Sequence, residues 1–103
     1  MKITLGDTIT NMTSNDYKKR FCAEYWQTKI RYERLKQLCR KIEAAQIANS
    51  DFCTGPNCIE VPPHDCPYEL LCEQLKIMGN YLKILEVRAV IEDVMLAEDL
   101  IEV

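Results

Sequence analysis

The sequence from residue 16 to residue 48 reads DYKKRFCAEYWQTKIRYERLKQLCRKIEAAQIA and contains no glycine or proline. Apolar and aromatic side chains recur in it at alternating spacings of four and three residues, with Thr28 as the one weak position. These residues are Phe21, Tyr25, Tyr32, Leu35, Cys39 and Ile42. Such a period is typical of an amphipathic helix with a heptad-like seam. We predict a helix over about 16–48, with Ser14, Asn15 and Asp16 available to cap its start.

A second helical pattern follows a stretch of turn-forming residues at 49–66. From residue 67 to residue 97 the chain reads PYELLCEQLKIMGNYLKILEVRAVIEDVMLA, and Pro67 suits the first position of a helix. One apolar stripe of this predicted helix comprises Leu71, Leu75, Met78, Leu82, Leu85 and Ala89. A second stripe, one position round the helix, comprises Leu70, Ile77, Tyr81, Ile84 and Ile91. A two-helix hairpin offers one partner face, so the surplus stripe favours burial between protomers.

The fold predicted from these patterns is all-α. It is a hairpin of two long antiparallel helices with a Cys/Pro-rich connecting loop, assembled as a homo-oligomer. The Thr-rich residues 1–15 are expected to form a short extended arm, and residues 16–103 one hairpin domain. The apolar tail after residue 93 is expected to dock. Gly79 lowers helix propensity, which either a close approach of the helices offsets or the chain tolerates.

Composition limits the class of protein. At 103 residues, 48% hydrophobic and 28% charged, the chain has the composition of a single globular domain. The formal net charge of −3 argues against binding of long nucleic acid. No stretch resembles a secretory signal or a membrane span, so we expect a cytosolic protein with reduced thiols.

One segment offers soft metal ligands. Cys53, Cys58, His64 and Cys66 supply three thiols and an imidazole, the inventory that zinc prefers. The spacing is unlike that of a zinc knuckle, so a disulfide or free thiols remain alternatives, and no cofactor is predicted beyond a possible structural zinc. The cysteines on the predicted helices are expected to be small core residues; they are Cys22, Cys39 and Cys72.

The sequence gives little support to catalysis. The chain has one histidine and lacks nucleotide-loop and metalloprotease motifs. The first predicted helix instead mixes aromatic and basic residues, among them Trp26, Lys29, Tyr32 and Lys36. These could stack on bases and hold phosphates, or the tyrosines could be core residues and the cations solvated surface.

Three segments carry a resemblance to a known group of proteins. They are Asp16-Tyr-Lys-Lys-Arg-Phe, Lys29-Ile-Arg-Tyr-Glu-Arg-Leu, and the run CPYELLCEQLKIMGNYLKILEVRA that begins at Cys66. Together they resemble small phage-encoded helical-hairpin proteins, and the layout is similar to that of the anti-CBASS and anti-Thoeris sponge proteins. The Cys-rich insertion and the Thr-rich arm depart from that pattern.

The resemblance implies a phage anti-defence protein in the host cytoplasm. Such a protein binds a cyclic oligonucleotide or a cyclic ADP-ribose isomer without catalysis, as a homo-oligomer that can be a hexamer. The implied ligand-binding positions are Lys29, Arg31, Tyr32, Gln74, Met78, Tyr81 and Arg88.

Two other hypotheses remain beside the nucleotide sponge. The first is a phage protein–protein interaction module that inhibits a host protein or assists assembly through the surplus apolar stripe. The second is a zinc-stabilised structural hairpin, which is compatible with either function.

Overall fold

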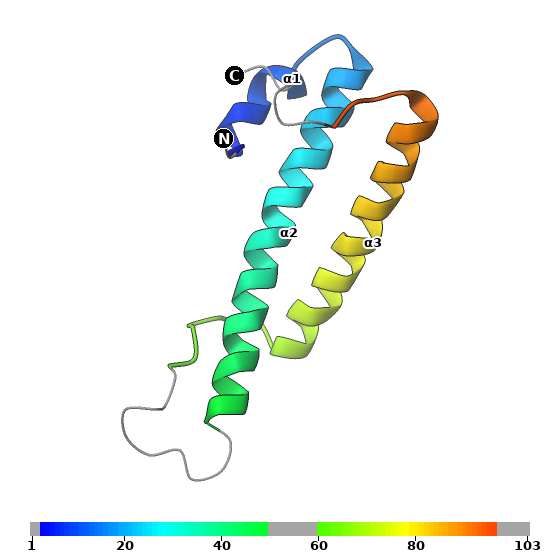
Figure 1. Cartoon of the computed structure of the whole chain (residues 1–103). Coiled ribbons are helices and arrows are strands. Elements are labelled where there is room, and N and C mark those ends of the chain that lie inside the picture. The colour runs from blue at the N-terminus through cyan, green and yellow to red at the C-terminus, as the bar shows by residue number, and fades with distance from the viewer. Residues whose placement is uncertain (1–2, 50–59, 97–103) are drawn as a thin grey trace.

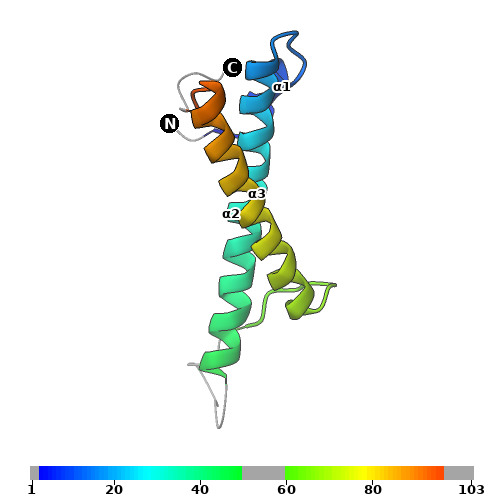
Figure 2. The same ribbon diagram turned by 90° about the vertical axis from the view of Figure 1, so that its right-hand side faces the viewer.

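The computed structural model describes residues 3–49 and 60–96, and all regular secondary structure in these ranges is helical. A 3-10 turn, η1 (Gly6–Thr8), and a short helix, α1 (Ile9–Met12), precede the two long helices α2 (Tyr17–Ala48) and α3 (Tyr68–Glu92). The long helices run antiparallel and cross at a shallow angle (Figures 1 and 2). The predicted all-α hairpin is therefore confirmed.

Helix α2 matches its sequence pattern within one residue at each end. The Asp16 side chain caps it by accepting a hydrogen bond from the Lys18 backbone N–H at 3.0 Å. The helix ends at Asn49, whose N–H donates to the Ala45 carbonyl at 2.9 Å. Its 32 residues make a helix about 48 Å long, the longest element of the described chain.

Helix α3 ends earlier than the predicted residue 97. Asp93 adopts a left-handed backbone conformation with φ 57° and ψ 49°, which aspartate tolerates better than most residues. The Val94 N–H then donates to the Ala89 carbonyl at 2.8 Å and closes the turn. The chain leaves the helix axis here and crosses onto α2, where the Trp26 indole N–H donates to the Leu96 carbonyl at 3.0 Å. The predicted docking of the tail is confirmed for residues 94–96.

The predicted extended arm is wrong over its described part. Residues 6–12 are helical because local side-chain hydrogen bonds close the turns. Thr4 donates its N–H to the Asp7 carboxylate at 2.9 Å, and the Thr8 hydroxyl donates to the Leu5 carbonyl at 2.7 Å. The segment lies beside the start of α2 (Figure 1), with Thr8 and Asn11 fully buried. The loose alternation of apolar and polar residues in this Thr-rich stretch did not predict its structure, because threonine hydroxyls also form hydrogen bonds within helical turns.

The core lies between one strip of α2 and one strip of α3. Its central cluster comprises Phe21, Tyr25, Leu82, Leu85, Ala89 and Val94. The Tyr25 hydroxyl donates to the Glu86 carboxylate at 2.7 Å. The pKa of Tyr25 is raised mainly by burial and secondly by this hydrogen bond. Burial also raises the pKa of the Cys22 and Cys39 thiols, in accord with their predicted place in the core.

The second apolar stripe of α3 is exposed, as expected for a stripe that a two-helix hairpin cannot cover. Four of its side chains recur every seven residues with exposed fractions of 55% at Leu70, 59% at Ile77, 56% at Ile84 and 77% at Ile91. Val87 adds a side chain that is 52% exposed. We call these five residues the outer stripe.

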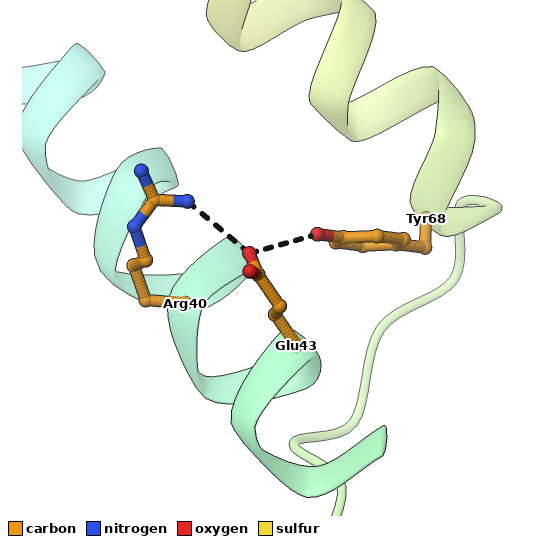
Figure 3. A network of polar contacts seen from close by, with 3 residues as sticks. All are labelled: Arg40, Glu43 and Tyr68. Carbon is orange, nitrogen blue, oxygen red and sulfur yellow. Dashed lines mark hydrogen bonds and ion pairs between the residues drawn. The ribbon is translucent and has the colours of Figure 1, made fainter. Parts of the chain in front are cut away.

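A polar network joins α2 and α3 where α3 begins. The Arg40 guanidinium lies 3.2 Å from the Glu43 carboxylate, and the Tyr68 hydroxyl donates to the same oxygen at 3.3 Å (Figure 3). Hydrogen bonding to Cys72, with a further contribution from Glu43, raises the pKa of Tyr68. The first turn of α3 is thereby fixed against α2.

Gly79 lies in close contact with Tyr32 of α2. A Cβ atom placed on Gly79 would lie 3.3 Å from Cε1 of Tyr32 on α2. The Tyr32 ring thus leaves little space at position 79, and a Cβ atom there would require the ring to shift by a few tenths of an ångström. This finding favours the first explanation of Gly79, a close approach of the helices, over a glycine that the chain merely tolerates.

Substitution of Gly79 by a large side chain tests this contact. Gly79→Leu should lower the free energy of unfolding by about 1–3 kcal/mol, because overpacking outweighs the gain in helix propensity. The measurement is urea unfolding followed by circular dichroism. Lys76→Leu, at an exposed position of the same helix, serves as the control and should change stability by less than about 0.5 kcal/mol. Equal stability of the two variants would contradict the close approach.

Candidate ligand-binding groove

A groove of about 480 Å³ runs along α2 beside the strip that packs on α3. One wall comes from the N-terminal segment through Ile3 and Thr4. The other wall comes from one face of α2 through Trp26, Lys29, Ile30, Glu33, Arg34 and Gln37. The three- and four-residue spacings of these α2 residues place them in one row. The volume falls within the usual range of small-molecule sites, which is about 300–1,000 Å³.

Trp26 is the aromatic element of the groove and is held in place from two sides. Its indole N–H is bound to the Leu96 carbonyl. Its ring meets Tyr25 edge to face, with ring centroids 5.3 Å apart and an interplanar angle of 87°. These contacts restrain the ring without covering it completely, because Trp26 is only half-buried. A restrained, partly open indole is suited to stacking on a planar ligand.

Two cations line the same wall of the groove as Trp26. Lys29 forms an ion pair with Glu33 at 3.3 Å, and its ammonium lies 5.8 Å from the centroid of the Tyr32 ring. Arg34 is exposed at the same wall. An ion pair this exposed adds little stability, so the Lys29 ammonium can be transferred to an anionic ligand at small cost. Guanidinium and ammonium groups are the usual partners of phosphate.

Of the ligand-binding residues predicted from sequence, Lys29 alone lines this groove. Tyr32 lies between the helices against Gly79. Arg31 is exposed on another face of α2. Gln74 points its amide nitrogen at the Met78 sulfur, 3.8 Å away along the same helix. Within one chain, the structure brings Lys29 over the ring of Tyr32 and places Arg31 on another face of α2.

Tyr81 and Arg88 belong to a second, structural cluster between α3 and the start of α2. The Tyr81 hydroxyl donates to the Glu24 carboxylate at 2.5 Å. Arg88 donates to Glu92 at 2.7 Å and lies 4.8 Å from the centroid of the Phe21 ring. The hydrogen bond from Arg88 lowers the pKa of the Glu92 carboxyl, and the same bond raises the pKa of Arg88.

The α2 residues of the groove that sequence reasoning missed are Ile30, Glu33, Arg34 and Gln37, while Trp26 was weighed but not assigned. A signal was present, because residues 26, 30, 33 and 37 recur at spacings of four, three and four, one or two positions after residues of the core seam. The wall opposite α2, formed by Ile3 and Thr4, could not be predicted because residues 1–15 were expected to be extended.

Only two of the four predicted zinc ligands lie among the residues that the structure describes. Cys53 and Cys58 lie outside the described residues. His64 and Cys66 are exposed, and His64 Nδ1 lies 2.8 Å from the Pro62 carbonyl oxygen. Within residues 3–49 and 60–96, no three potential metal ligands come together.

Comparison with known protein families identifies the chain. The model of the Sequestin family matches residues 15–91, which include both long helices. The chain belongs to the Sequestin family. The family name describes a protein that sequesters a molecule, and the α2 wall of the groove lies within the matched residues. No curated protein and no solved structure matches the chain. Among the described helices, none has the length and apolar character needed to cross a membrane.

The Arg88–Glu92 ion pair predicts a pH dependence of stability. Because the pKa of Glu92 is lowered in the folded chain, the pair stabilises the fold above the ordinary carboxyl pKa, and this contribution is lost as the pH falls through the lowered value. Arg88→Gln should therefore lower the melting temperature at pH 7 and by less at about pH 3. Thermal unfolding by circular dichroism across this range provides the measurement.

Lys41→Gln is the control, since Lys41 is exposed on α2 and its substitution removes the same single charge. Its difference from the native protein should not show this pH dependence. A constant difference between Arg88→Gln and the native protein at all pH values would contradict the role assigned to the ion pair.

Proposed function

We propose that this Sequestin-family protein binds a cyclic nucleotide second messenger and sequesters it without catalysis. The observation that carries the proposal is the α2 groove, where a restrained indole and two cations line one cavity in a protein of a sequestering family. A cyclic nucleotide presents planar bases and phosphates, which these two kinds of side chain recognise. The resemblance to phage sponges adds the biological setting, which is the silencing of an immune signal in the host cytoplasm.

The groove also supports retention rather than chemistry. Its titratable lining consists of Lys29, Glu33 and Arg34, and Lys29 and Glu33 are already paired with each other. No nucleophile–base pair lies among the described lining residues, and a site that only holds its ligand needs none.

Removing both cations tests the groove as the binding site. The double variant Lys29→Ala/Arg34→Ala should lose at least tenfold in affinity for the cyclic nucleotide that the native protein binds, because two phosphate contacts are removed. In the native protein, ligand at 100 times its dissociation constant should add about 2.7 kcal/mol to the free energy of unfolding. Calorimetric titration and melting curves with cyclic dinucleotides and cyclic ADP-ribose isomers measure the two effects.

The control variant Arg31→Ala/Lys41→Ala removes the same number of positive charges from exposed positions of α2 outside the groove. It should retain native affinity. Equal loss in both double variants would show a general charge effect and contradict the groove as the site.

We propose further that a second copy of the chain covers the outer stripe of α3. A seven-residue recurrence of Leu and Ile on one face is the pattern that another helix of the same kind fills. A two-fold contact uses the same surface on both copies. An antiparallel arrangement directs Glu73 toward the half of the partner helix where Lys83 and Arg88 border the stripe. Parallel copies would instead bring two Glu73 carboxylates together.

Charged residues in the outer stripe should separate the copies. Ile77→Glu/Ile84→Glu should convert the oligomer to monomer while leaving the helical content unchanged, as measured by light scattering after gel filtration. Ile9→Glu/Val61→Glu changes two exposed apolar residues outside α3 and should leave the oligomer intact. A native protein that is already monomeric at high concentration would contradict this interface.

The alternative function is a protein–protein interaction module, and the outer stripe is the observation that favours it. A host protein would then cover Ile77 and Ile84 in place of a second copy. This alternative predicts a monomer that gains no stability from cyclic nucleotides, which the titrations above distinguish from the sponge.

A further inference from the structure

The two long helices face each other in one register along the hairpin. Several contacts share it, among them those that join Tyr25 to Glu86, Tyr32 to Gly79 and Glu43 to Tyr68. From the first pair to the second, the position advances by seven residues on α2 and recedes by seven on α3. From the second pair to the third, both steps are eleven residues. Seven and eleven residues are close to whole numbers of helical turns, so the three pairs lie on one strip of each helix.

Cys39 and Cys72 occupy a position between the last two of these pairs. Cys39 follows Tyr32 by seven residues, and Cys72 precedes Gly79 by seven. The register therefore places the two cysteines opposite each other, one on each helix. Their thiols are joined by a hydrogen bond, which, after burial and the charge of Cys72, raises the pKa of the Cys39 thiol.

The two thiols differ in their access to solvent. Cys39 is 1% exposed, whereas Cys72 is half-buried near the start of α3. A small reactant in solution can thus reach the Cys72 sulfur and cannot reach that of Cys39. The other described cysteines are placed differently, since the Cys22 thiol donates to the Met95 carbonyl and Cys66 is exposed before α3 begins.

We propose that Cys39 and Cys72 form a modification site at which a low-molecular-weight disulfide links α2 covalently to α3. The Cys72 thiolate attacks one sulfur of the small disulfide, which forms a mixed disulfide and releases one small thiolate. Cys39 then gives up its proton to solvent and attacks Cys72 Sγ, which expels the second small thiolate. Two electrons pass from the two cysteines to the small disulfide, which leaves as two thiols. The second step is intramolecular, so the buried Cys39 needs no contact with the small reactant.

The disulfide closes a covalent loop that includes the whole connection between the helices, residues 49–67. Closing a loop of this length restricts the unfolded chain and thereby stabilises the fold. Cys72 lies in the second turn of α3, close to a helix end that can adjust to the shorter distance of a covalent bond. The inference goes beyond nucleotide sequestration and does not depend on it.

The test is oxidation of the reduced full chain in mixtures of reduced and oxidised glutathione. Remaining thiols are then alkylated in denaturant, and the chain is cut with trypsin and a glutamate-specific protease. This digestion separates three of the cysteines, with Cys39 in peptide 37–40, Cys66 in peptide 61–69 and Cys72 in peptide 70–73. Mass spectrometry should find peptides 37–40 and 70–73 joined, two hydrogen atoms lighter than their sum, in most chains. Peptide 61–69 should be alkylated or carry glutathione.

The melting temperature provides an independent measurement. The oxidised native protein should melt about 10 °C above the reduced protein, and dithiothreitol should reverse this rise. Cys72→Ser changes a half-buried position and should show no rise on oxidation. Cys66→Ser is the matched control, because Cys66 is exposed outside the helix pair, and it should keep the full rise.

Three outcomes would overturn the cysteine pair. The first is glutathione attached to Cys72 while Cys39 is recovered only as the alkylated thiol, which would show that the two sulfur atoms do not meet. The second is a link from Cys39 to any other cysteine peptide, which would contradict the register. The third is a rise in melting temperature on oxidation that persists in Cys72→Ser.

Discussion

The contact between Tyr32 and Gly79 sets how closely the two long helices approach, and the rest of the molecule depends on that approach. With the Tyr32 ring in the space of a missing side chain, one strip of α2 and one strip of α3 bury each other, from Phe21 and Leu85 to Cys39. A hairpin of two helices can bury only one strip of each, so two apolar surfaces remain. One becomes a wall of the groove beside Trp26, and the other is the outer stripe of α3.

The turn at Asp93 converts the first of these surfaces into a site. By leaving the helix there, the chain brings residues 94–96 across α2, where the Leu96 carbonyl fixes the Trp26 indole. The N-terminal turns close the opposite wall through Ile3 and Thr4. The groove is therefore built from the N-terminal segment and the segment after α3, both folded back on α2. Binding sites are often formed by such connecting segments on a regular scaffold.

The long helices could be predicted from sequence because their apolar residues repeat over many turns, and an expectation based on one repeat is reinforced by the next. Gly79 was recognised as a point of interest, but its partner Tyr32 could not be chosen without knowing the register of the two helices. The N-terminal turns were missed because their helical state rests on single side-chain hydrogen bonds, such as that from Thr8 to Leu5. The contacts of Tyr81 with Glu24 and of Arg88 with Glu92 could not be predicted either, because they depend on how the side chains meet in the folded hairpin.

The central claim is that the protein holds a nucleotide and returns it unchanged. The most direct measurement is to mix the purified protein with cyclic dinucleotides and cyclic ADP-ribose isomers, remove free ligand by ultrafiltration, denature the protein with heat, and identify what is released by mass spectrometry. We expect one ligand to be retained in proportion to the protein and recovered with its mass and retention time unaltered. Recovery of a converted product, or retention of none of these ligands, would contradict sequestration.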